Sequence, residues 1–186
     1  MTRRMAAKYR VFGVVALVLF ALDRAAKMWV LLNLEIGERF DVIPGFFYLT
    51  HVRNPGAAFG LFANSGAEIK VIAFSAVAAL ALIIIAVHLR SLAPGEKRES
   101  AALALVAGGA LGNLVDRLPY FGSVDVIDFL HLDWWHGYPW PDFNIADIAI
   151  VAGVGMLVVE MVAREAAPHS DVSSNTSQRE SGHRPQ

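Results

Sequence analysis

The stretch VIAFSAVAALALIIIAVHL at residues 71–89 contains no Lys, Arg, Asp or Glu. Since about 20 apolar residues in a helix cross the hydrocarbon core of a bilayer, this stretch predicts a transmembrane helix. Similar stretches lie at residues 11–32, 101–118 and 143–163. The sequence therefore predicts a mainly α fold, a four-helix transmembrane bundle with helices at about 11–32, 69–90, 101–118 and 143–163.

Composition and charge also indicate a membrane protein. Hydrophobic residues make up 55% of the 186 residues and the mean hydropathy is +0.46. Charged residues make up only 18%, whereas they are about 25% of an average soluble domain. The net charge of -1 provides no basic face for phosphates, so we expect no nucleic-acid partner. The absence of cysteine excludes disulfides, thiolate metal ligands and a cysteine nucleophile.

Two polar segments separate the expected helices. Residues 33–66 include the β-prone runs Phe46 to Leu49 and His51-Val52, and residues 119–142 are rich in Trp, Tyr, His and Asp. We expect the first segment to form a small extracytoplasmic β-containing loop domain. We assign residues 1–166 to a single integral-membrane domain. Residues 167–186 lack hydrophobic periodicity and are expected to form a disordered cytoplasmic tail.

The positions of Lys and Arg predict the orientation in the membrane, because cytoplasmic segments carry an excess of these residues. They are concentrated before the first helix, after the second and after the fourth, whereas the segment 119–142 contains none. We therefore expect a multi-pass inner-membrane protein with both termini in the cytoplasm and both polar segments outside. The basic residues concerned are Arg3, Arg4, Lys8, Arg10, Arg90, Lys97, Arg98 and Arg164.

Several polar side chains fall inside the expected membrane helices, where a charge is costly unless it is paired or hydrated. Because successive helices alternate in direction, we expect all of them in one layer near the outer face. The simplest interpretation of the pair in the first helix, four residues apart, is a structural ion pair. The residues are Asp23 and Lys27 in the first helix, Asn113, Asp116 and Arg117 in the third, and Asn144 and Asp147 in the fourth.

Short motifs along the chain resemble, in order, those of lipoprotein signal peptidase, also called signal peptidase II. The motifs are LDRAAK at 22–27, RNPG at 53–56 with Phe59, GGALGNLVDR at 108–117, VDVIDF at 124–129 and FNIAD at 143–147. The resemblance implies a bacterial inner-membrane aspartic endopeptidase that cuts signal peptides from prolipoproteins, just before a cysteine carrying diacylglycerol. It implies no cofactor and no metal, and its implied partners are lipidated prolipoproteins and membrane lipids.

The resemblance also implies roles for individual residues. By matching position, Asp125 and Asp147 are the expected catalytic pair. The residues that match those holding the substrate or stabilising and supporting the site are Asn54, Asn113, Arg117, Asn144, Asp23, Lys27 and Asp116. One position departs from the family pattern, since Ser123 stands where the first of two valines usually precedes the aspartate. Asp128 is therefore an alternative, but Asp-Val-Ile-Asp-Phe fits the pattern with Asp125 first.

Two neighbouring carboxylates suit hydrolysis of an amide without a covalent intermediate. The reaction needs a base that deprotonates water and an acid that protonates the carbonyl oxygen and then the leaving nitrogen, and two close carboxyl groups can fill both roles. Mutual repulsion and desolvation raise one pKa above about 3.9, so the pair holds a single proton near neutral pH. Such a pair titrates as a unit, and the sequence does not assign the proton to either member.

Three alternative interpretations have weaker support. His131, Asp133 and His136 are ligand types that suit zinc, but they lack the His-Glu-x-x-His helix pattern. Ser75 and His88 do not belong to a nucleophile motif. A small transporter or channel subunit would use the intramembrane acidic residues as an ion or proton relay. A relay requires ionisable groups across the whole membrane, and the second helix supplies almost none.

Overall fold

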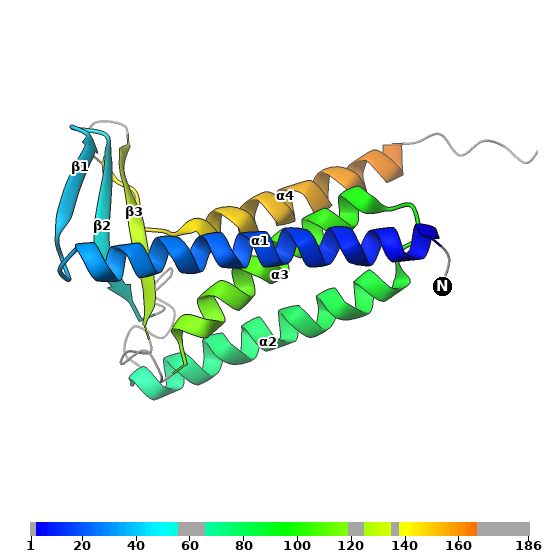
Figure 1. Ribbon diagram of the computed structural model, residues 1–186, viewed down its shortest axis with the longest axis horizontal. Helices are drawn as coiled ribbons and strands as arrows, with labels where there is room; N and C mark the ends of the chain where they lie inside the picture. The colour runs from blue at the N-terminus through cyan, green and yellow to red at the C-terminus, as the bar shows by residue number, and fades with distance from the viewer. Residues whose placement is uncertain (1–2, 56–65, 119–124, 135–137, 167–186) are drawn as a thin grey trace, which may run out of the picture.

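The computed structural model describes residues 3–55, 66–118, 125–134 and 138–166, which form helices with an antiparallel sheet at one end (Figure 1). The expected tail at 167–186 and the motif residues Gly56 and Phe59 lie outside the described residues. The helices are α1 (Arg3–Asn33), α2 (Ala67–Ser91), α3 (Lys97–Asp116) and α4 (Ile145–Ala166). The strands are β1 (Arg39–Ile43), β2 (Phe47–Asn54), β3 (Val126–Trp134) and β4 (Tyr138–Pro139).

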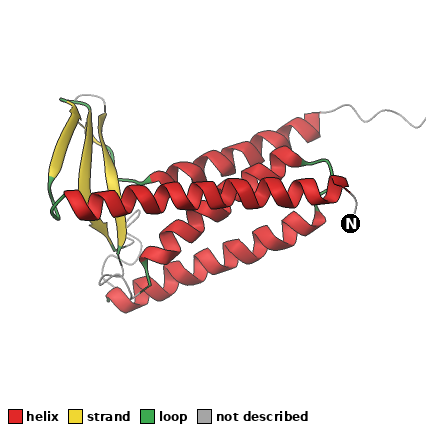
Figure 2. Cartoon of the chain, viewed as in Figure 1, coloured by secondary structure: helices red, strands yellow, loops and turns green. Residues whose placement is uncertain are grey.

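The mainly helical fold with a small sheet is confirmed (Figure 2). The sheet is larger than the sequence indicated, because β3 and β4 come from the segment 119–142, for which we expected only a loop. Val126, Ile127, Asp128 and Phe129 are all buried in β3. A strand that is buried on both faces lacks the alternation of apolar and polar residues that identifies a half-buried strand.

Helix α3 lies at the centre of the bundle and packs against α1, α2 and α4. Its buried side consists mainly of alanine and glycine, which let neighbouring backbones approach closely. A Cβ atom on Gly108 would lie 3.0 Å from the carbonyl oxygen of Ala16 in α1. One on Gly109 would lie 2.5 Å from the carbonyl oxygen of Ala146 in α4. These small residues therefore set the spacing of the three helices.

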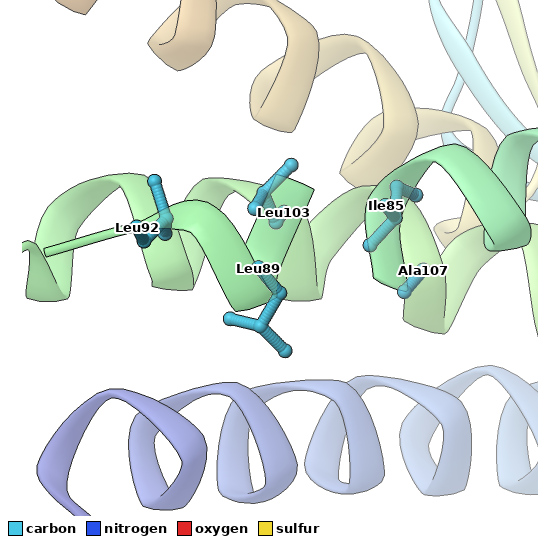
Figure 3. Packing of buried hydrophobic residues seen from close by; sticks show 5 residues of the cluster. All are labelled: Ile85, Leu89, Leu92, Leu103 and Ala107. Carbon is cyan, nitrogen blue, oxygen red and sulfur yellow. The ribbon is translucent and has the colours of Figure 1, made fainter. Parts of the chain in front are cut away.

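An apolar cluster joins the helices at the end away from the sheet (Figure 3). Side chains of α1 and α4 that are partly buried, including Tyr9, Phe12 and Leu157, pack against this cluster. The packing therefore closes this end of the bundle with side chains from all four helices. The buried residues of the cluster are Ile85, Leu89, Leu92, Leu103 and Ala107.

The side chain of Lys8 is buried at the same end and connects α1 to the C-terminal end of α2. Its ammonium group donates to the carbonyl oxygens of Arg90, at 3.2 Å, and of Leu92. The last carbonyl groups of a helix have no intrahelical partner and carry partial negative charge, so a cation stabilises them. Ser100 of α3 donates to the carbonyl oxygen of Lys8 at 2.7 Å.

The sheet has the strand order β1-β2-β3-β4, with antiparallel neighbours throughout. It is anchored to the end of α1 by a second apolar cluster, in which Val30 and Leu34 pack with Ile127 and Phe129 of β3. His51 of β2 lies 2.9 Å, through Nδ1, from the carbonyl oxygen of Leu34. Strand β3 is thereby held beside the end of α3 and the start of α4 (Figure 1).

Within the described residues, α2 and α4 are the helices that are long and apolar enough to cross a membrane by length and composition. Charged residues lower the hydropathy of α1 and α3, so this measure supports the predicted transmembrane bundle only in part. Helix α1 nevertheless exposes Val14, Leu17, Val18 and Leu22, and α2 and α4 expose similar apolar belts. Apolar surfaces of this extent are typical of proteins that contact an apolar environment.

Replacing Gly109 with alanine should destabilise the bundle, because the added Cβ would lie 2.5 Å from the carbonyl oxygen of Ala146. We expect the free energy of unfolding to fall by about 1–3 kcal/mol, measured as a lower thermal midpoint of the detergent-solubilised protein. Gly155→Ala in α4 is the matched control, because nothing lies within 4 Å of its Cβ position. The control should keep or raise the midpoint, and equal losses in both variants would contradict the close approach of α3 and α4.

Candidate active site

Lys27 is a buried cation at the centre of a polar cluster between α1 and α3. Its Nζ atom lies 3.0 Å from Asp23, 2.7 Å from Asp116 and 2.9 Å from Oδ1 of Asn113. The exposed fraction of each charged side chain in this group is at most 2%. Arg24 also contacts the carboxylates of Asp23, at 3.0 Å, and Asp116, at 2.5 Å. Two cations therefore balance two carboxylates, which is the condition under which buried charges are tolerated.

Asp23 extends this cluster to α4. Its Oδ1 atom accepts a hydrogen bond from the backbone N–H of Ala146 at 3.1 Å. The N–H groups in the first turn of a helix have no intrahelical partner, and a carboxylate placed there is also favoured by the helix dipole. The carboxylate lies beside Gly112 of α3, where an added Cβ would be 2.6 Å from Oδ2 of Asp23. Only glycine therefore fits at position 112, where the carboxylate of Asp23 lies against α3.

Asn144 and Asp147 cap the start of α4 reciprocally. The Oδ1 atom of Asn144 accepts from the N–H of Asp147 at 3.0 Å, and Oδ2 of Asp147 accepts from the N–H of Asn144 at 3.1 Å. This arrangement is a capping box, which requires polar side chains at the residue before the helix and at its third residue. The three-residue spacing within FNIAD therefore has a structural cause, and the cap fixes one oxygen of Asp147.

Asn113 holds the other oxygen of Asp147. Its Nδ2 atom donates to Oδ1 of Asp147 at 2.8 Å, while its own Oδ1 accepts from Lys27 at 2.9 Å. An ammonium group can only donate, so the contact with Lys27 fixes which end of the amide faces Asp147. The buried charge cluster therefore orients Asn113, and Asn113 orients Asp147.

Asp128 of β3 joins the sheet to the start of α4. Its two oxygens accept hydrogen bonds from Nδ2 of Asn54 in β2 and Nδ2 of Asn144, both at 2.7 Å. Burial raises the pKa of Asp128 to about 6; the two amide donors oppose this rise and the charge of Asp147 adds to it. Asp128 thus holds Asn54 and Asn144 in place on either side.

Arg117 and Asp125 lie at the border of the cluster. Asp125 is half-buried at the bend immediately before β3, and Arg117 directly follows α3. The Nη1 atom of Arg117 donates to the carbonyl oxygen of Asn113 at 2.9 Å. Its guanidinium group also interacts electrostatically with the carboxylates of Asp116, Asp147, Asp128 and Asp125. Asp125 and Asp147 therefore lie within the field of the same cation.

The side chains singled out in the sequence thus lie together at the sheet end of the bundle. Two contributions were missed by sequence reasoning, namely the two ion pairs of Arg24 and the two amide contacts of Asp128. A charge next to Asp23 inside an apolar helix was a signal for the first. The residues connected by these contacts are Asp23, Lys27, Asn54, Asn113, Asp116, Arg117, Asp128, Asn144 and Asp147.

The residues of the alternative interpretations lie elsewhere. His131 contacts Asp133 at 3.2 Å and Asp142 at 3.0 Å in the sheet, and His136 lies outside the described residues. Over the described ranges, no group of three or more His, Cys, Asp or Glu residues is placed to hold a metal ion. His88 contacts Glu99 at 2.8 Å, at the opposite end of the bundle from the sheet.

The fold of this chain is similar to that of two solved structures. One structure, described as a bacterial membrane enzyme, matches with a TM-score of 0.70 and 31% identity, over 81% of this chain and 91% of its own. A second, described in the same way, matches with a TM-score of 0.74 and 29% identity, over 87% and 93%. The helical bundle with its sheet is therefore the fold of these membrane enzymes.

Comparison of sequences then identifies the family. The family model for signal peptidase (SPase) II matches residues 15–163. The lipoprotein signal peptidase of Geobacter sulfurreducens is 41% identical over 84% of this chain and 94% of its own length. That of Moorella thermoacetica is 44% identical over 81% and 92%. The chain belongs to the signal peptidase II family, and the resemblance seen in its motifs is confirmed.

The raised pKa of Asp128 predicts that stability depends on pH. The folded protein favours the protonated carboxyl group, so this contribution is complete below the ordinary pKa of 3.8 and is lost as pH rises through about 6. The difference between the two pKa values corresponds to about 3 kcal/mol. Thermal midpoints of wild type and Asp128→Asn should be compared from pH 4 to pH 7. The midpoint of the wild type should fall relative to that of the variant, and a constant difference would rule out this titration.

Proposed function

We propose that this protein is an aspartic endopeptidase that removes signal peptides from diacylglyceryl-modified prolipoproteins, cutting before the lipidated cysteine. Membership of the signal peptidase II family supports the reaction and the substrate class. The observation that carries the aspartic mechanism is the position of Asp125 and Asp147, whose carboxylates both interact electrostatically with the Arg117 guanidinium group. The side-chain amide of Asn113 also donates a hydrogen bond to Asp147. We assign Asp125 and Asp147 as the catalytic residues.

Asp125 is better suited to catalysis than its alternative, Asp128. A catalytic carboxylate must be reached by water and by the substrate. Asp128 is only 2% exposed and accepts hydrogen bonds from Asn54 and Asn144 on its two oxygens. Asp125 and Asp147 are both half-buried. We therefore assign Asp128 to the support of the site, together with Asp23, Lys27 and Asp116.

In the proposed reaction one carboxylate of the pair takes a proton from a water molecule, whose oxygen adds to the scissile carbonyl carbon. The other member of the pair donates its proton to the carbonyl oxygen. When the tetrahedral intermediate collapses, the carbon–nitrogen bond breaks and the carboxyl group that took the proton from water gives it to the leaving nitrogen. The other carboxylate takes back a proton from one hydroxyl group of the intermediate, so a carbonyl group re-forms and the pair again holds one proton. Arg117 stabilises the negative charge on this pair, and Asn113 holds Asp147 in the orientation that the reaction needs.

We further propose that all four helices cross the bacterial inner membrane, with both termini in the cytoplasm and the sheet outside. The apolar belts of α1, α2 and α4 support this placement. At the end away from the sheet lie the basic residues Arg90 and Arg164, as expected for cytoplasmic segments. Residues 1–166 then form one peptidase domain, with the polar cluster near the outer face.

A site at the outer face suits a lipidated substrate. Its acyl chains remain in the membrane, so the bond beside the lipidated cysteine is held near headgroup depth. Trp140 is 53% exposed at the sheet end, as expected for an aromatic residue that contacts membrane lipids at the interface. A transporter or channel subunit agrees less well with these features, because the buried residues Asp23, Asp116 and Asp128 gather at the sheet end of the bundle and the family is a peptidase family.

Replacement of either Asp125 or Asp147 by asparagine should lower cleavage of a diacylglyceryl-modified prolipoprotein by about a thousandfold or more, because each variant removes one of the two proton-transfer groups. Asp41→Asn is the matched control, since Asp41 is exposed on β1. Cleavage is measured with purified protein, beside the unlipidated prolipoprotein as substrate. Near-normal cleavage by either site variant, with insertion intact, would refute the assignment.

The topology is testable because the chain contains no cysteine. A cysteine introduced at Asp41 in β1 should react with a membrane-impermeant maleimide in intact spheroplasts, because this strand faces outward in the proposal. A cysteine introduced at Gly95, between α2 and α3, should react only after permeabilisation. Labelling of the Gly95 variant in intact spheroplasts would overturn the proposed orientation.

A further inference from the structure

The segment from Asp142 to Asn144, just before α4, runs along β3 in the antiparallel direction. Asn144 donates through its side chain to Asp128 at 2.7 Å. Phe143 pairs with Leu130 through backbone hydrogen bonds of 2.9 and 3.1 Å. Asp142 contacts Nδ1 of His131 at 3.0 Å. Successive residues of the segment therefore meet β3 in reverse order at three levels.

His131, which contacts Asp142 at the start of this segment, is enclosed on several sides. Its side chain is only 13% exposed, and its Nε2 atom lies 3.2 Å from Oδ1 of Asp133, which also pairs with Arg39 at 2.9 Å. The ring packs against that of Tyr48 in β2, with ring centroids 5.8 Å apart. The contacts with Asp133 and Tyr48 therefore hold the imidazole in place independently of its contact with Asp142.

Asp142 is held by two strands at once. The Oδ1 atom that contacts His131 also accepts a hydrogen bond from the hydroxyl group of Thr50 in β2 at 2.9 Å. Two residues after Asp142 comes the capping residue Asn144, and the cap includes Asp147. A shift at Asp142 is therefore transmitted to the first turn of α4.

We propose that His131 is a positioning residue for peptide hydrolysis. Asp125 directly precedes β3 and His131 lies further along this strand, whereas the segment after Asp142 leads to Asp147 in α4. The contact between His131 and Asp142 thus fixes the distance between the two elements that carry the proposed catalytic carboxylates. This inference rests on the proposed function. None of the chemistry passes through the imidazole, so its loss alters geometry alone.

Two substitutions of His131 separate its two contacts. An asparagine places an amide N–H close to the position of Nδ1, and a glutamine places one close to that of Nε2. His131→Asn therefore keeps the contact with Asp142, and His131→Gln keeps only the contact with Asp133. We expect His131→Gln to lower kcat about tenfold or more with KM changed less than about twofold, because displaced reacting groups slow the chemical step. His131→Asn should retain kcat within about threefold.

The variant Asp142→Ala removes the same contact from the other side. It should lower kcat at least as much as His131→Gln, because it also removes the hydrogen bond from Thr50. The double variant should fall no further than Asp142→Ala alone, because the contact between His131 and Asp142 is already lost in that variant. If His131→Gln unfolds, as judged by its thermal midpoint, Asp142→Ala carries the test. The inference is overturned if kcat falls equally in both His131 variants, falls in neither, or falls by the product of the single losses in the double variant.

The same assay distinguishes failure of this inference from failure of the proposed function. Wild type and Asp147→Asn are measured in parallel on the lipidated prolipoprotein. Cleavage by Asp147→Asn would refute the aspartic mechanism, whatever the His131 variants do. An inactive Asp147→Asn beside a fully active His131→Gln would refute only the positioning role.

Discussion

The buried ammonium group of Lys27 is the interaction on which the rest of the structure depends. An unpaired charge in an apolar helix bundle is strongly unfavourable, so Lys27 requires the carboxylates of Asp23 and Asp116 within 3.0 and 2.7 Å. These partners come from α1 and α3, and Asp23 also binds the first turn of α4. The charge therefore fixes α1, α3 and α4 relative to one another at one depth. The alanine and glycine residues along α3 permit this close approach.

From this fixed point the contacts lead outward to the sheet. Lys27 orients Asn113, Asn113 holds Asp147, and Asp147 forms the cap with Asn144. Asn144 in turn binds Asp128 in β3, which binds Asn54 in β2. The residues at the border of this path, Asp125 and Arg117, meet half-exposed surface. A buried cluster thus supports a half-exposed border, as the proposed site for a substrate at the membrane surface requires.

Individual residues show which parts of the fold and of the site the sequence predicts. Asp23 and Lys27 were identified because charges four apart in an apolar helix must pair, and FNIAD because its spacing places two polar side chains at a helix start. Strand β3 was missed because its first four residues, 126–129, are all buried and do not alternate between buried and exposed. The contacts of Asp128 with Asn54 and Asn144 join three segments distant in the chain, so no local pattern encodes them. In the sequence, Lys8 served only as evidence for a cytoplasmic N-terminus. Its charge alone does not show that its ammonium group binds the carbonyl groups at the end of α2. The catalytic roles proposed for Asp125 and Asp147 come from family resemblance, not from any pattern within the chain.

Asp125 and Asp147 are proposed to act together on one amide bond, and the most direct test is a structure with a substrate peptide in which a secondary alcohol replaces that bond. The hydroxyl group should lie within about 3 Å of an oxygen of Asp125 and of Asp147. Asp128 should remain bound to Asn54 and Asn144. A hydroxyl group held by Asp128, or by only one carboxylate with the other out of reach, would contradict the proposed pair.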